Sequence, residues 1–301
     1  MNMKVDLCGV TLNNPVMTAS GTFGSGAEYA EFVDLNKLGA VVTKGVANVP
    51  WPGNPTPRVA EVYGGMLNAV GLQNPGIDLF VERDIPFLKQ FDTKIMVNVC
   101  GHSTEEYIEV VERLSDQPVD LLEINISCPN VKEGGIAFGQ DPKAAEAITK
   151  EMKKHAAQPV IMKLSPNVTD ITEMARAAEA GGADGLSLIN TITGMKIDIN
   201  RQKFVLANKT GGMSGPAIHP VAVRMVYQTA QAVSIPIVGM GGIMNAEDAI
   251  EMILAGATAV SVGTANFTNP HVTEEIVAGI RDYMERYQVA DIRDLVGAVH
   301  E

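Results

Sequence analysis

The chain has 301 residues, of which 46% are hydrophobic and 19% charged, a composition that can bury a large core. It carries 23 Lys and Arg residues against 35 Asp and Glu, a formal net charge of −12, and no basic run that could follow a nucleic-acid backbone. No stretch approaches the roughly 20 apolar residues of a membrane span, and the start of the chain lacks the apolar core of a signal peptide.

The cysteines indicate the compartment. Cys8, Cys100 and Cys128 are odd in number and widely spaced, with no CxxC pair. This pattern is typical of a reducing compartment and argues against a disulfide framework, a zinc site or an iron–sulfur cluster held by this chain alone. We therefore expect a cytoplasmic protein with no metal of its own, which binds neither nucleic acid nor a membrane.

Eight short runs rich in apolar and β-branched residues alternate with helical patterns along the chain. The predicted strands are Val16–Ser20, Ala40–Lys44, Ile95–Val99, Leu121–Ile126, Val160–Leu164, Gly185–Ile189, Ile237–Met240 and Ala259–Val262. The clearest helical patterns are Thr104–Ser115, Pro142–His155, Thr169–Ala180, Pro220–Val233 and Ala246–Ala255, and the weakest is the short Tyr29–Leu38. Apolar strands that alternate with helices indicate a parallel sheet buried on both faces. Eight such units predict an α/β fold, a closed (β/α)₈ TIM barrel that forms one domain over residues 1–301.

Two connections are longer than a barrel requires. One runs from Gly45 to Asp78 and the other from Asn190 to His219. Long loops in compact domains usually cover or form a binding site, although insertions without a role are the alternative. Both connections follow predicted strands, so we expect them on the catalytic face. Val5–Leu12 is predicted to form an N-terminal hairpin that closes the opposite end of the barrel.

Every predicted strand ends in a polar residue or a glycine. These residues are Ser20, Lys44, Asn98, Asn125, Lys163, Asn190 with Thr191, Gly241 with Gly242, and Gly263 with Thr264. Active sites of (β/α)₈ barrels are built at the carboxyl ends of the strands. The pattern therefore predicts a pocket lined by these side chains.

The last two strands are followed by glycine turns. Gly241 and Gly242 lead into the helix that opens near Asn245, and Gly263 and Thr264 follow the eighth strand. Glycines let backbone N–H groups approach an anion, and a helix N-terminus adds partial positive charge. This is the usual phosphate site of the fold, whereas tight turns that merely need glycine are the alternative. The sequence GMGGIM lacks the third glycine of a dinucleotide fingerprint.

Lys44 and Lys163 end two buried strands. A buried ammonium is costly unless it is paired, and the sequence shows no obvious acidic partner at either strand end. We therefore expect a ligand to supply the negative charge, unless both lysines extend to solvent. Together with a phosphate site, the two lysines favour flavin mononucleotide (FMN), a cofactor that gains electron density when reduced.

Side-chain amides and one thiol complete the predicted site. Asn68, Asn125, Asn130 and Asn190 offer donors and acceptors that complement the alternating C=O and N–H edge of a pyrimidine or similar imide. Cys128 follows Asn125 in a polar turn, where a thiol can act as a base. We assign Cys8 and Cys100 to core packing. The five histidines, His102, His155, His219, His271 and His300, are assigned to structural or surface positions.

Several motifs together resemble one family. They are NISCPN, MLNAVGLQN, VTKG, INT, GGMSGPA, GMGGI and VGTA, and the resemblance covers essentially residues 5–287. The chain is similar to the catalytic subunits of class 1B dihydroorotate dehydrogenases. This resemblance implies an FMN-containing barrel that oxidises (S)-dihydroorotate to orotate in pyrimidine biosynthesis. It also implies that Cys128 takes the proton from ring carbon five while hydride leaves the neighbouring carbon for the flavin.

The resemblance implies a set of binding residues as well. FMN would be bound by Ser20, Lys44, Gly45, Asn98, Asn125, Lys163, Ile189, Gly215, Gly241, Gly242, Gly263 and Thr264. The substrate would contact Lys44, Asn68, Ala69, Val70, Gly71, Leu72, Asn125, Asn190 and Thr191, with Asn130 as a further contact.

The electron acceptor is implied by the same resemblance. Class 1B enzymes rely on a second subunit that carries FAD and an iron–sulfur cluster and passes electrons to NAD. We therefore expect a heterotetramer built around a homodimer of this chain. Class 2 members, with a serine base and a membrane-associated extension, resemble the chain less. A class 1A-like enzyme that uses fumarate, a non-redox phosphate-binding lyase or isomerase, and a catalytically silent flavin carrier are the alternatives.

Overall fold

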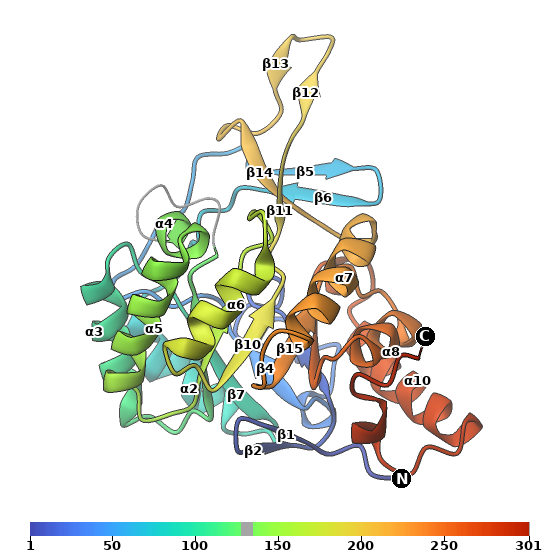
Figure 1. The fold of residues 1–301 in the computed structure, drawn as a ribbon. Coiled ribbons are helices and arrows are strands. Elements are labelled where there is room, and N and C mark those ends of the chain that lie inside the picture. Colours follow the sequence, from blue (N-terminus) through green and yellow to red (C-terminus); the bar gives the residue numbers. More distant parts are fainter. Residues whose placement is uncertain (128–134, 301) are drawn as a thin grey trace.

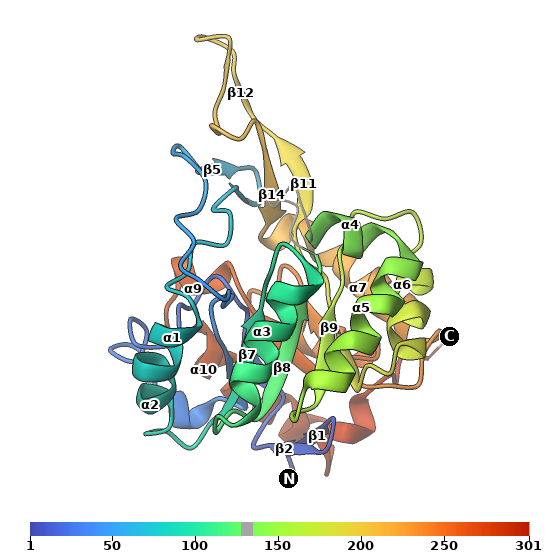
Figure 2. The same ribbon diagram turned by 90° about the vertical axis from the view of Figure 1, so that its left-hand side faces the viewer.

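The computed structural model describes residues 1–127 and 135–300 and forms an α/β barrel (Figures 1 and 2). Eight parallel strands close in the order β10-β15-β16-β3-β4-β7-β8-β9. They are β3 (Val16–Thr18), β4 (Ala40–Val42), β7 (Lys94–Val99), β8 (Leu121–Asn125), β9 (Val160–Lys163), β10 (Gly185–Leu188), β15 (Ile237–Met240) and β16 (Ala259–Val262). Nearly every strand residue is buried, because helices cover the outside and side chains fill the inside. The predicted eight-stranded barrel is confirmed.

Helices surround the barrel on its outer face (Figure 2). The longer ones are α3 (Thr104–Ser115), α5 (Pro142–His155), α6 (Ile171–Ala180), α7 (His219–Ala230), α8 (Ala246–Leu254) and α10 (Val272–Arg286). Shorter ones are α1 (Ile77–Leu79), the π-helical turn Phe80–Asp84, α2 (Ile85–Leu88), α4 (Gly135–Gln140) and α9 (Ala265–Thr268). Side-chain caps fix several starts: Ser103, Asp141, Asp170 and Asn245 each accept a hydrogen bond from a backbone N–H of the first turn. None of the helices in the described residues is long and apolar enough to cross a membrane.

The segment after β3 differs from the prediction. Tyr29–Leu38 was expected to be helical, but only Leu35–Lys37 forms a 3₁₀ turn. Asp34 has an extended backbone and its carboxylate accepts from the N–H of Asn36, so it starts this short turn. The local side-chain bond therefore competes with a continuous helix, as Asp commonly does.

The two long connections fold together above the barrel. They form one antiparallel sheet, called the roof sheet here, in the order β11-β14-β6-β5. Its strands are β5 (Val59–Val62), β6 (Gly65–Asn68), β11 (Ile192–Met195) and β14 (Thr210–Ser214). A further hairpin, β12 (Ile197–Asp198) with β13 (Lys203–Phe204), projects beyond it (Figure 1). The predicted N-terminal hairpin, β1 (Val5–Leu7) with β2 (Val10–Leu12), lies at the opposite end. The long connections therefore cover the carboxyl ends of the strands, as predicted.

Candidate active site

A pocket lies between the carboxyl ends of the barrel strands and the roof sheet. Of the predicted residues it is lined by Ser20, Lys44, Gly45, Asn68, Val70, Gly71, Leu72, Asn98, Asn125, Lys163, Ile189, Asn190, Thr191, Gly241, Gly242, Gly263 and Thr264. These residues come from distant parts of the chain, and the fold brings them together at one end of the barrel. Residues that the sequence analysis did not single out, including Thr22, Met66, Ser214 and Ser261, also line the pocket.

Among the residues that the structure describes, two predicted binding residues do not line this pocket. Ala69 is fully buried and packs with Ala60, Leu67 and Leu206 in a small separate core. Gly215 lies behind the turn after β15 and packs closely against Gly242. A Cβ added to Gly242 would lie only 2.8 Å from the carbonyl oxygen of Gly215. Both residues therefore contribute to the shape of the site from behind its surface.

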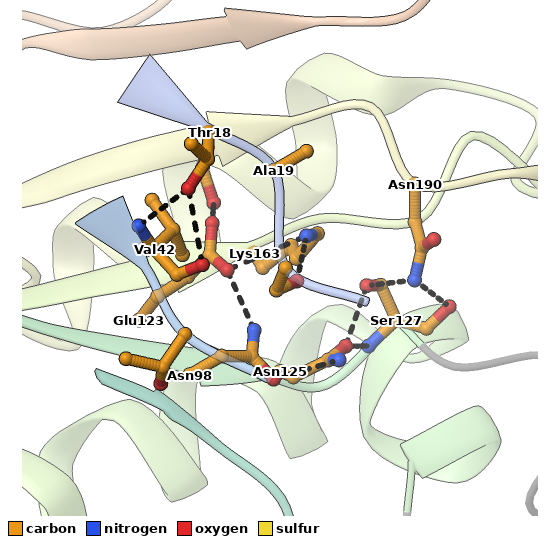
Figure 3. A network of polar contacts seen from close by, with 12 residues as sticks. Thr18, Ala19, Val42, Asn98, Glu123, Asn125, Ser127, Lys163 and Asn190 are labelled. Carbon is orange, nitrogen blue, oxygen red and sulfur yellow. Dashed lines mark hydrogen bonds and ion pairs between the residues drawn. The ribbon is translucent and has the colours of Figure 1, made fainter. Parts of the chain in front are cut away.

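Lys163 has an acidic partner, so the expectation that only a ligand could balance its charge was wrong. Its ammonium lies 3.3 Å from Oε2 of Glu123 and donates to Ser20 Oγ at 2.9 Å. Glu123 also accepts from Asn98 Nδ2 at 2.6 Å (Figure 3). Its other oxygen accepts from Ser187 Oγ at 2.7 Å. Lys163 is 3% exposed and Glu123 only 1%. The sequence signal was present: Glu123 precedes Asn125 by two residues in β8, so both side chains point into the barrel.

A second network fixes the end of β8. Ser127 Oγ donates to Asn125 Oδ1 at 2.9 Å, and Asn190 Nδ2 donates to Ser127 Oγ at 2.8 Å and to the Ser127 carbonyl at 3.2 Å (Figure 3). From behind, the Tyr107 hydroxyl donates to the carbonyl of Asn125 at 2.7 Å. The backbone is therefore held firmly up to the residue before Cys128.

Cys128 and Asn130 lie outside the described residues, so their predicted roles stay predictions. The other two cysteines fit the assignment to core packing. Cys100 is fully buried beside Ala47 and Trp51. Burial, with a smaller contribution from nearby Asp184, raises the pKa of the Cys8 thiol to about 12. A thiol in that state is protonated at neutral pH and a poor nucleophile.

The turn after β15 has the geometry expected of an anion site. Gly241 and Gly242 both have positive φ, +131° and +70°. His219, at the start of α7, is buried and its Nδ1 lies 2.8 Å from the carbonyl oxygen of Gly241, while its Nε2 lies 3.1 Å from Glu251. Since the carbonyl accepts from the imidazole behind it, the orientation of the Gly241–Gly242 peptide is fixed. His219 was assigned a structural position from the sequence, and it supports the predicted phosphate turn.

The turn after β16 is linked to the roof sheet. Thr264 Oγ1 donates to Ser214 Oγ, at the end of β14, at 2.8 Å. Ser261, two residues before Gly263, lines the pocket, and its buried Oγ has no hydrogen-bond partner among the described residues. A Cβ on Gly263 would meet nothing closer than 3.5 Å, the methyl of Ala19. A Cβ at Gly263 would thus make only ordinary van der Waals contacts, so the end of β16 is not tightly packed at this point.

Fold and site together define an α/β-barrel enzyme whose pocket combines a buried and a half-buried lysine with side-chain amides and glycine turns. A family model described as dihydroorotate dehydrogenase matches residues 2–284. The chain belongs to the dihydroorotate dehydrogenase family.

Curated relatives match over the full length. The chain is 72% identical over 299 residues to "Dihydroorotate dehydrogenase B (NAD(+)), catalytic subunit" of Lachnoclostridium phytofermentans, covering 99% of this chain and 100% of the relative. It is 64% identical to the protein of that name from Alkaliphilus metalliredigens, covering 99% of each. A crystal structure of DHODH in complex with ferulenol from Eimeria tenella superposes with a TM-score of 0.83 at 22% identity, over 99% of this chain and 88% of that one. The last likeness concerns the fold alone.

Proposed function

We propose that this chain is the catalytic subunit of an NAD-linked dihydroorotate dehydrogenase, which oxidises (S)-dihydroorotate to orotate in pyrimidine biosynthesis. The observation that carries the proposal is the pocket at the strand ends. It gathers two lysines, four amide side chains and the glycine turns in a chain 72% identical to a catalytic subunit of this activity. A lyase or isomerase would leave this full-length identity without an explanation.

FMN fits the residues that are present. The left-handed Gly241–Gly242 turn and the loosely packed Gly263, which both line the pocket, supply a cradle for a phosphate. Lys163 would lie against the part of the flavin that becomes negative. Ser20, Lys44, Gly45, Asn98, Asn125, Ile189 and Thr264 complete the FMN set in this proposal, with Gly215 behind the turn that it supports. In the proposal residues 1–301 act as a single domain. When bound, FMN supplies the acceptor for the electron pair that leaves the substrate.

The chain's own residues bind the substrate and move its proton. The amides of Asn68, Asn125 and Asn190 complement a ring edge of alternating donors and acceptors, and Lys44 and Thr191 add further contacts. Val70, Gly71 and Leu72 belong to the same connection as Asn68 and complete the substrate set, and Ala69 supports them from behind the pocket surface. Cys128 accepts the proton from ring carbon five. Asn190 and Asn125 hold Ser127, the residue before Cys128 in the sequence.

The electrons pass to a second protein. Relatives are named as catalytic subunits, which supports a separate partner. In our proposal this partner carries FAD and an iron–sulfur cluster, and two copies of each chain form a heterotetramer around a homodimer of this chain. The odd number of widely spaced cysteines supports a reducing location, the cytoplasm.

One preparation tests substrate and acceptor together. Anaerobic mixing of the FMN-loaded protein with dihydroorotate should bleach the flavin absorbance. NAD should then restore it only in the presence of the partner subunit, whereas direct reoxidation by fumarate would favour the class 1A-like alternative. A protein that takes up no FMN, or whose flavin is not bleached, would refute the proposal.

The base is tested by substitution. Cys128→Ala should retain flavin but slow its reduction by dihydroorotate by roughly 10²–10⁴, the usual contribution of a positioned base. Cys8→Ala is the matched control, because this thiol lies in the turn of the N-terminal hairpin, at the end of the barrel opposite the pocket, and it should leave the rate unchanged. Equal rates in both variants would remove Cys128 from the mechanism.

A further inference from the structure

Glu123 is a buried carboxylate directly behind the pocket. It does not line the pocket, but its partners Lys163 and Asn98 do. The contacts cross four neighbouring barrel strands: Asn98 is on β7, Glu123 on β8, Lys163 on β9 and Ser187 on β10. Such a network is rigid, because each side chain is anchored on a strand that is paired on both sides.

The partners of Glu123 show which form of the carboxyl group the site is built for. Asn98 Nδ2 and Lys163 Nζ donate to one oxygen, and Ser187 Oγ donates to the other. A carboxylate only accepts hydrogen bonds, so three donors are matched by the ionised form. Asn98 and Ser187 are fully buried, and Glu123 is 1% exposed, so water does not screen this charge effectively.

The lysine divides its donors between the network and the pocket. An ammonium has three N–H donors. Glu123 and Ser20 take two of them among the described residues, at 3.3 and 2.9 Å. The third is available to a ligand in the pocket that Lys163 lines. The charge that this ligand experiences is therefore that of an ammonium with a carboxylate immediately behind it.

We propose that Glu123 is a positioning residue that offsets part of the Lys163 charge and thereby limits how strongly the pocket favours reduced over oxidised flavin. The inference rests on the proposed FMN site. Two-electron reduction leaves the flavin ring anionic at neutral pH, whereas the oxidised ring is neutral. A full positive charge at Lys163 would stabilise the anionic form, and the carboxylate behind it weakens that preference. Electron transfer onward to the partner subunit is then favoured.

Glu123→Gln removes the charge and can keep every hydrogen bond. The amide oxygen can accept from Asn98 and Lys163, and the amide nitrogen can donate to Ser187 Oγ, because a hydroxyl also accepts. The variant therefore separates the charge of Glu123 from its packing. Ser187→Ala is the matched control, because it removes one hydrogen bond from the same carboxylate and leaves the charge in place.

The measurement is the midpoint potential of bound FMN, by anaerobic spectroelectrochemical titration of the purified holoprotein. Glu123→Gln should favour reduced over oxidised flavin at least tenfold more than the wild type, a positive shift of about 30 mV for a two-electron couple. Ser187→Ala should shift the potential by much less. A purely structural role for Glu123 would lower stability without moving the potential.

The outcomes separate this inference from the proposed function. A flavin-loaded Glu123→Gln protein with the wild-type potential would overturn the role of Glu123 and leave the FMN site intact. If this variant does not fold, Glu123→Asp is measured, because the shorter side chain moves the carboxylate away from Lys163. A positive shift then supports the inference, and an unchanged potential overturns it. A wild-type protein that binds no FMN would overturn the proposed function and the inference with it.

Discussion

Gly242 allows a direct test of the predicted phosphate turn. Its φ is +70°, and a Cβ at this position would lie 2.8 Å from the Gly215 carbonyl oxygen and 2.9 Å from the His219 backbone nitrogen. Both neighbours are backbone atoms, so rotation of a side chain cannot relieve the clash. Left-handed backbone costs a residue with a Cβ about 1–2 kcal/mol, and overpacking adds about 1–3 kcal/mol. We expect Gly242→Ala to lower the free energy of unfolding by about 2–5 kcal/mol.

Gly9 provides the matched control. Its φ is +83°, and a Cβ there would meet nothing within 4 Å. Gly9→Ala therefore carries the backbone strain alone, about 1–2 kcal/mol, at the end of the barrel opposite the pocket. The cost of Gly242→Ala exceeds that of Gly9→Ala by about 1–3 kcal/mol, which is the overpacking at the turn after β15. If the turn shifts to relieve it, FMN should bind about 5- to 150-fold more weakly to Gly242→Ala.

Two assays on both variants decide the matter. Titration of the apoprotein with FMN, followed by quenching of flavin fluorescence, gives the dissociation constant, and urea denaturation gives the free energy of unfolding. The assignment of this turn to the phosphate would be refuted if Gly242→Ala and Gly9→Ala had the same dissociation constant for FMN and the same free energy of unfolding.

Three further predictions follow from contacts elsewhere in the molecule. Tyr107→Phe removes the donor to the buried carbonyl of Asn125 and should lower the free energy of unfolding by about 1–3 kcal/mol in urea denaturation; an unchanged value would show that this bond adds no stability. Ser214→Ala removes the acceptor of Thr264 and should weaken FMN binding about 2- to 13-fold in the fluorescence titration, whereas full affinity would mean that the roof sheet does not support the phosphate turn. Because burial raises the pKa of Cys8 to about 12, its thiolate is scarce at pH 8, and alkylation by iodoacetamide, followed by mass spectrometry, should be slow and accelerate about tenfold per pH unit. Alkylation at the rate of a free thiol would contradict the raised pKa of Cys8.

The barrel was predictable because its pattern is local and repeated. Ile237–Met240 and Ala259–Val262 have the predicted bounds, as do the helices Thr104–Ser115 and Pro142–His155. Apolar runs bounded by glycine or polar residues define such strands, and capping residues define the helix starts. The expected helix at Tyr29–Leu38 was wrong, because a side-chain cap within the segment directs the backbone into a short turn instead.

Other features depend on contacts that no local pattern contains. The pairing of β6 with β14 places Asn68 opposite Gly212, although the two residues are 144 positions apart in the sequence. Glu123 was missed as the partner of Lys163 because the search for a counter-ion was confined to the strand ends, whereas this carboxylate lies inside β8. The side-chain parity of a strand would have found it, since Glu123 and Asn125 share a face.

The roof sheet also has a consequence for the order in which the molecule assembles. Its two halves come from separate connections, and they can meet only after the barrel has brought those connections together. Bringing two such distant segments together costs conformational entropy. The hydrogen bonds between the roof strands offset this cost only once both segments are in place. We therefore expect the mouth of the pocket to form late in folding and to open early under stress. A protease added under mildly destabilising conditions should cut there while the cylinder below remains intact.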